Sequence, residues 1–93
     1  MHKNFKILWT DEAIRQLKDY KKSKHDDIDS YLTKIIELIQ SIENNPFEGL
    51  GKPEPLKNYY PKSWSRRINK KDRLIYKVEN KKVYIISILG HYE

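Results

Sequence analysis

The chain contains no cysteine among its 93 residues. This absence excludes disulfide bonds, thiolate catalysis and zinc–thiolate sites together. No apolar run approaches the roughly 20 residues that span a membrane, and the N-terminus lacks the apolar core of a signal peptide. The three histidines lack the spacing of metal ligands, and no pair of carboxylates suggests a metal site. We therefore expect a soluble, cytoplasmic protein of one domain, residues 1–93, with no metal, other cofactor or membrane partner.

The net charge of +6 comes from the second half of the chain. Residues 1–51 carry 8 Lys/Arg against 9 Asp/Glu, whereas residues 52–93 carry 11 against 4. A surface that only keeps a protein in solution mixes the two signs, so this asymmetry favours a polyanionic partner. Nucleic acid is favoured over a membrane, because the basic half is predicted to form strands and not a basic amphipathic helix.

The first half of the chain predicts a strand followed by two helices. Residues 3–9 end in an apolar run typical of a strand, and Thr10 or Asp11 is expected to cap a helix that breaks at residues 23–26. A second helix is predicted by apolar residues at spacings of three and four, namely Ile28, Leu32, Ile35, Ile36, Ile39 and Ile42. The sequence Asn44-Asn45-Pro46 ends this helix.

The second half predicts a loop and then strands. Two glycines and three prolines between residues 47 and 61 indicate a loop, with a short strand near Leu56. Three strands are expected at residues 63–69, 73–79 and 82–89, the last with the apolar content of an internal strand. The order β-α-α-β-β-β predicts an α+β fold, in which two antiparallel N-terminal helices pack on one face of a mostly antiparallel twisted sheet.

The hydrophobic pattern also predicts the register of the hairpin formed by residues 63–79. Pairing Ile68 with Leu74, across a loop of residues 70–72, collects the apolar side chains on one face. A slip of one residue would separate them. This register places Arg67 and Arg73 together on the opposite face. Arg66 falls on the apolar face, and its charged end is expected to reach the edge of the sheet.

Four segments of the basic half carry a family resemblance. They are residues 45–57 (NPFEGLGKPEPLK), 64–68 (WSRRI) and 73–76 (RLIY), and the terminal His91-Tyr92. In this order and spacing they resemble the YoeB/Txe branch of the RelE-type toxins, which are bacterial ribosome-dependent mRNA endonucleases. The resemblance runs through most of the chain and implies a RelE-like fold. This chain departs from the pattern by adding Glu93 after the tyrosine, and by carrying Gly90 where a bulkier residue is common.

Cleavage of RNA by its own 2′-hydroxyl needs three kinds of group. A base accepts the hydroxyl proton, cations stabilise charge on the phosphoryl oxygens, and an acid protonates the departing 5′-oxygen. The resemblance implies that Glu54 is the general base and His91 the general acid, and that Arg67 and Arg73 stabilise the transition state. Planar guanidinium groups suit paired phosphoryl oxygens, and an imidazole can donate a proton near neutral pH.

Further residues are expected to position the RNA. The resemblance implies that Tyr92 orients the phosphate or stacks on a base, and that Lys57 holds the scissile phosphate. The cations predicted to contact RNA are Lys52, Lys57, Arg66, Lys70 and Lys71. Taken singly, each of these residues also fits a solvated surface position. The functional interpretation gains its strength from the joint order of the four segments.

The resemblance also implies partners, while two other functions fit the same basic face. The expected partners are the ribosome with its mRNA and an antitoxin of the YefM type, whose acidic disordered tail would neutralise the basic face. Operator DNA would be bound only through the antitoxin complex. The resemblance also implies a homodimer like those of close relatives, although the sequence contains no interface signal. The alternatives are a non-catalytic RNA-binding module, in which Glu54 and His91 would not matter, and an antitoxin-dependent corepressor.

Overall fold

The structure is a computed structural model that describes residues 4–23, 26–57 and 61–90. Its elements are β1 Lys6–Trp9, α1 Asp11–Lys22, α2 Ile28–Asn44, β2 Glu54–Pro55, β3 Ser63–Arg67, β4 Arg73–Glu79 and β5 Lys82–Gly90. The strands form one sheet in the order β1-β5-β4-β3-β2, and β1 pairs with β5 in parallel while the other pairs are antiparallel. The predicted α+β fold is confirmed, and the short strand expected near Leu56 is β2. Within the described residues, neither helix is long and apolar enough to cross a membrane.

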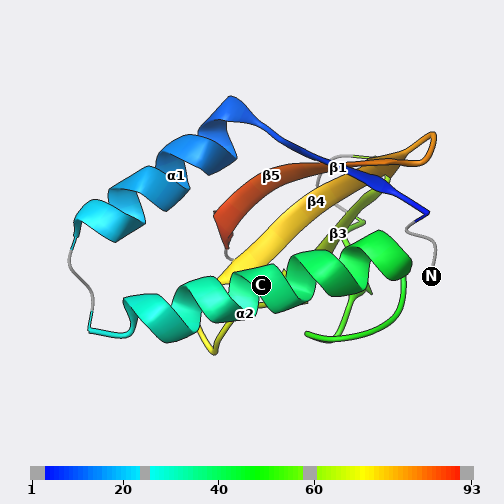
Figure 1. Cartoon of the computed structure of the whole chain (residues 1–93). Coiled ribbons are helices and arrows are strands. Elements are labelled where there is room, and N and C mark those ends of the chain that lie inside the picture. Colours follow the sequence, from blue (N-terminus) through cyan, green and yellow to red (C-terminus); the bar gives the residue numbers. More distant parts are fainter. Residues whose placement is uncertain (1–3, 24–25, 58–60, 91–93) are drawn as a thin grey trace.

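The helices begin and end where the sequence signals predict. Thr10 caps α1, because its Oγ1 accepts a hydrogen bond from the Ala13 amide at 3.2 Å. Helix α2 ends at Asn44, directly before Asn45 and the buried Pro46. Figure 1 shows α1 and α2 running in roughly opposite directions, with α2 lying across the sheet.

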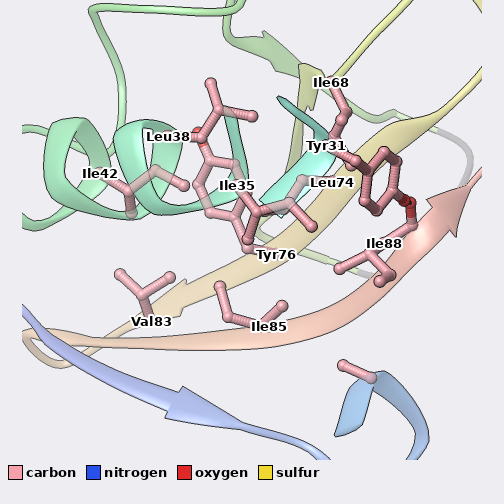
Figure 2. Packing of buried hydrophobic residues seen from close by; sticks show 11 residues of the cluster. Tyr31, Ile35, Leu38, Ile42, Ile68, Leu74, Tyr76, Val83, Ile85 and Ile88 are labelled. Atoms are coloured by element: carbon pink, nitrogen blue, oxygen red, sulfur yellow. The ribbon is translucent and has the colours of Figure 1, made fainter. Parts of the chain in front are cut away.

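The hydrophobic core lies between the sheet and the helices (Figure 2). Helix α2 contributes Tyr31, Ile35, Leu38 and Ile42, whose spacing places them on one face of the helix. The strands and the β3–β4 loop contribute Ile68, Leu74, Tyr76, Val83, Ile85 and Ile88. Alternate residues of these strands project from the other face of the sheet, where Ser65 and Ile75 are buried but Arg67 is exposed and Arg73 is half-buried.

The β3–β4 hairpin has a register two residues away from the predicted one. Arg67 pairs with Arg73, so the connecting loop comprises residues 68–72 and not 70–72. Asn69 organises this loop, since its Oδ1 accepts hydrogen bonds from the amides of Lys71 and Asp72 at 2.8 and 2.7 Å. A shift of two residues leaves every side chain on its predicted face. The predicted register is therefore wrong, but the predicted division of side chains between the faces is confirmed.

Strand β5 contains register shifts opposite the segment of β4 from Arg73 to Tyr76. Val83 and Ile85 face the core, and the next core residue is Ile88. In an uninterrupted strand the core-facing residues would all be odd-numbered or all even-numbered, because side chains alternate between faces. A bulge moves the core-facing side chains from odd to even positions, and it also changes the direction of the residues that follow.

The end of β5 is held by side chains of both helices. Strand β1 ends at Trp9 and does not extend alongside Ile88. Instead, the Ile88 amide donates to Gln16 Oε1 of α1 at 2.8 Å, and the Tyr31 hydroxyl of α2 donates to the Ile88 carbonyl at 3.1 Å. Figure 2 shows the Tyr31 hydroxyl directed at β5. Side-chain hydrogen bonds from Gln16 and Tyr31 therefore hold the end of β5, where β1 no longer pairs with it.

Two stacked tyrosines predict a loss of stability at alkaline pH. The ring centroids of Tyr20 and Tyr31 are 3.9 Å apart. Burial and then a hydrogen bond to Asp27 raise the pKa of Tyr20 to about 12, and burial also raises the pKa of Tyr31. An unfolded tyrosine has a pKa of about 10, so above this pH the unfolded chain loses protons that the folded chain keeps. The free energy of unfolding should therefore fall as the pH rises from about 10 towards 12.

Urea unfolding at a series of pH values measures this effect. The Tyr20→Phe variant is the matched control, because it keeps the stacked ring but removes one titrating hydroxyl. Its free energy of unfolding should fall less steeply with pH than that of the wild type. Equal slopes for the two proteins between pH 10 and 12 would contradict the prediction.

Candidate active site

The predicted catalytic residues that the structure describes share one face of the sheet. Glu54 of β2 pairs with Ser65, while Arg67 of β3 pairs with Arg73 of β4, which in turn pairs with Gly90 of β5. Directly paired residues project to the same face, as do residues two apart on one strand. Glu54, Arg67 and Arg73 therefore project together from the face opposite the core residues.

The charged groups on this face are available to a ligand. Arg67 and Glu54 are exposed, and Arg73 is half-buried, with one weak hydrogen bond from its Nη1 to the Asn69 carbonyl at 3.4 Å. Within residues 4–23, 26–57 and 61–90, none of the three charged side chains forms an ion pair. Two neighbouring guanidinium groups without a carboxylate partner suit bidentate contact with a phosphate.

All four lysines predicted to bind RNA are exposed. Lys52 lies in the loop before β2 and Lys57 follows β2, while Lys70 and Lys71 lie in the β3–β4 loop. Exposed lysines can neutralise the backbone phosphates of a nucleic acid. In the described part of the chain, no group of His, Asp and Glu is arranged to hold a metal ion.

Arg66 does not belong to this surface. Its side chain is fully buried and donates five hydrogen bonds, to Tyr76, Ser41, Asn45, Glu48 and Leu50. A guanidinium has five N–H groups, so this set uses all of them. The predictions that Arg66 contacts RNA and that its charged end reaches the sheet edge are therefore wrong. The loop of residues 45–50 covers this position, and no local sequence pattern reveals that contact.

Three residues whose hydrogen bonds support β5 and Arg66 were not predicted from the sequence. Gln16 and Tyr31 bind Ile88 across 72 and 57 positions of the chain, and Ser41 binds Arg66 across 25. Periodicity and capping signals act within a few residues, so they cannot identify such pairs. His91 and Tyr92, the predicted acid and its neighbour, lie outside the described residues.

The close packing around Gly90 leaves no space for a side chain at this position. A Cβ at this position would lie 2.3 Å from Ile75 Cδ1 and 3.3 Å from the Arg73 carbonyl oxygen. Ile75 is buried and occupies the space that a side chain at position 90 would need. The glycine therefore permits close packing of β4 and β5 directly beside Arg73.

Comparison with known proteins agrees with the resemblance seen in the sequence. Residues 9–92 match the family described as YoeB-like toxin of bacterial type II toxin-antitoxin system. The chain is 39% identical over 87 residues to Toxin YoeB of Escherichia coli strain K12, a match that covers 94% of this chain and 99% of that protein.

Solved structures give the same result. The YoeB dimer from Staphylococcus aureus superposes with a TM-score of 0.80 at 34% identity, covering 96% of this chain and 99% of that one. The heterotetrameric YoeB-YefM toxin-antitoxin complex from the same organism gives a TM-score of 0.76 at 35% identity, covering 95% and 98%. The chain therefore belongs to the family of YoeB-like toxins of bacterial type II toxin–antitoxin systems.

Proposed function

We propose that this toxin is a ribosome-dependent endoribonuclease that cuts mRNA in the ribosomal A site and so inhibits translation. One observation carries the proposal. Arg67 and Arg73 pair across adjacent strands, without a carboxylate partner among the described residues, on the same sheet face as Glu54. This arrangement supplies a base and two fixed cations for attack of a 2′-hydroxyl on the adjacent phosphorus.

Each proposed residue has one role in this reaction. Glu54 accepts the proton of the 2′-hydroxyl as its oxygen forms a bond to phosphorus, and Arg67 and Arg73 stabilise the charge on the phosphoryl oxygens. His91 donates a proton to the 5′-oxygen as its bond to phosphorus breaks. The products are a 2′,3′-cyclic phosphate, or its hydrolysed form, and a 5′-hydroxyl. Tyr92 and the four exposed lysines, Lys52, Lys57, Lys70 and Lys71, position the RNA, and the reaction requires no metal or cofactor.

Replacing the 2′-hydroxyl next to the scissile phosphate with hydrogen should abolish cleavage at that phosphate, because the nucleophile is removed. Ribosomes would be programmed with an all-RNA message or with a message carrying one deoxynucleotide, and the 5′ ends would be mapped after addition of the toxin. Binding of the toxin to both complexes is the control. Cleavage of the substituted message at the same phosphate would refute the proposed chemistry.

We also propose that the toxin binds a cognate antitoxin and a second copy of itself. Its relatives from Staphylococcus aureus are described as a YoeB dimer and as a YoeB-YefM heterotetramer. An acidic antitoxin segment would complement the exposed cations of the sheet face, whose charge also attracts RNA. Operator DNA would be reached only through the toxin–antitoxin complex.

A further inference from the structure

We propose that Arg66 is a positioning residue for RNA cleavage. Its buried guanidinium holds the loop of residues 45–52 in place, and this loop leads directly into β2 and Glu54. The inference rests on the proposed function, since it concerns the placement of the proposed base. It assigns to Arg66 a role that differs from that of Arg67, the next residue in the chain.

The guanidinium lies in a cage of loop carbonyls. Arg66 Nη2 donates to the carbonyls of Asn45 and Glu48 at 2.6 and 3.1 Å. Its Nη1 donates to the Leu50 carbonyl at 3.0 Å and to Ser41 Oγ at 2.7 Å. Among the described residues, no carboxylate forms an ion pair with Arg66. The loop carbonyls therefore take the place of water around a buried cation, and their own hydrogen bonds depend on it.

Two further side chains connect the cage to the core. The Arg66 Nε donates to the Tyr76 hydroxyl at 3.1 Å, and this hydroxyl donates to the Pro46 carbonyl at 2.5 Å. Ser41 Oγ, which accepts from Arg66, also accepts from the Leu50 amide at 3.2 Å. The loop is thus joined through one network to α2 and β4, so movement of the loop breaks several hydrogen bonds at once.

The network reaches Glu54 through the end of the loop. Gly51 has a φ of +82°, and its carbonyl accepts a hydrogen bond from the Arg67 amide at 2.7 Å. A Cβ at Gly51 would lie 2.7 Å from Leu38 Cδ2, so the loop is packed directly on α2. Three residues later, Glu54 pairs with Ser65 of β3. The side chain of Arg66 and the backbone of Arg67 therefore hold successive parts of one segment that ends at the proposed base.

Three variants test the positioning role. Tyr76→Phe and Ser41→Ala each remove a hydroxyl of the network without altering the charged face. Arg66→Lys keeps the charge but concentrates its donors on one nitrogen, which cannot reach both sides of the cage. Lys70→Ala is the matched control, because it removes an exposed cation that is proposed to contact RNA. For each variant we would measure the single-turnover cleavage rate, the ribosome affinity at several salt concentrations, and amide exchange in residues 45–52.

Arg66→Lys should cleave about 10²-fold more slowly than the wild type, as expected for a small displacement of a reacting group, and Tyr76→Phe and Ser41→Ala about 10-fold more slowly. All three should exchange the loop amides faster, while their ribosome affinity and its salt dependence stay at wild-type values. Lys70→Ala should instead make the plot of log ribosome affinity against log salt concentration less steep by about 0.7. It should leave amide exchange in residues 45–52 unchanged.

The positioning role would be overturned if Arg66→Lys cleaved at the wild-type rate, or if its ribosome affinity fell by the same factor as its cleavage rate. If Arg66→Lys failed to fold, Tyr76→Phe and Ser41→Ala would test the positioning role in its place. Faster loop exchange in both, combined with wild-type cleavage, would overturn the role while leaving the proposed function intact. A wild-type protein that cut no mRNA would overturn the proposed function and this inference together.

Discussion

Replacing His91 with alanine is expected to lower the single-turnover rate of mRNA cleavage by about 10²–10⁴-fold. The departing 5′-oxygen is a poor leaving group unless it receives a proton, and His91 is the proposed donor. This residue directly follows Gly90, which pairs with Arg73. The variant should retain the wild-type far-UV circular dichroism and ribosome affinity, because the histidine is proposed to act on the leaving group and not on binding.

A substrate with a better leaving group separates the acid from the base. An RNA carrying sulfur at the 5′-bridging position needs little protonation, so it should restore much of the activity of His91→Ala. Glu54→Ala should show no such rescue, because its proposed proton transfer takes place at the 2′-hydroxyl. Equal rescue of both variants, or of neither, would mean that these two roles are wrongly assigned. A His91→Ala variant that remained fully toxic in cells would refute the site as a whole.

Arg67→Ala and Arg73→Ala are each expected to lower the cleavage rate by about 10²–10³-fold, the size of the loss when one electrostatic group is removed from a transition state. Ribosome affinity should change far less, because the two guanidinium groups are proposed to bind the charge that develops during reaction. Single-turnover cleavage and equilibrium binding, measured on the same ribosome complexes, would provide the comparison.

The charge-matched control is Lys82→Ala, which removes an exposed cation at the opposite end of β5 from Gly90. It should cleave at nearly the wild-type rate. If the arginine variants lost affinity and rate by the same factor, the arginines would serve binding alone. That outcome would favour a non-catalytic RNA-binding module over a ribonuclease.

The two adjacent arginines of β3 show how one strand can serve both the interior and the site. Successive side chains of a strand point to opposite faces, so a pair of neighbouring arginines must divide between them. Arg67 meets solvent, whereas Arg66 is buried under the loop of residues 45–50. Although both side chains carry the same charge, only one of them is available to a polyanion.

Features of this toxin that depend on neighbouring residues could be predicted from the amino-acid sequence alone. Thr10 and Asn44 mark helix ends because capping and helix-breaking residues act within one turn. The placement of Arg67 and Arg73 on one face follows from the period of two in a strand, which a shift of two residues does not alter. The family was also apparent from the order of short segments along the chain.

Features that depend on distant partners could not be predicted from the sequence and became apparent in the folded chain. Ile88 faces the core because bulges shift the register of β5 relative to β4. Gln16 and Tyr31 of the two helices then form hydrogen bonds with the Ile88 backbone. The buried state of Arg66 depends on carbonyls 16 to 21 positions earlier in the chain. Such contacts have no local pattern, because a charged side chain is stable inside a protein only where the assembled fold satisfies all its donors.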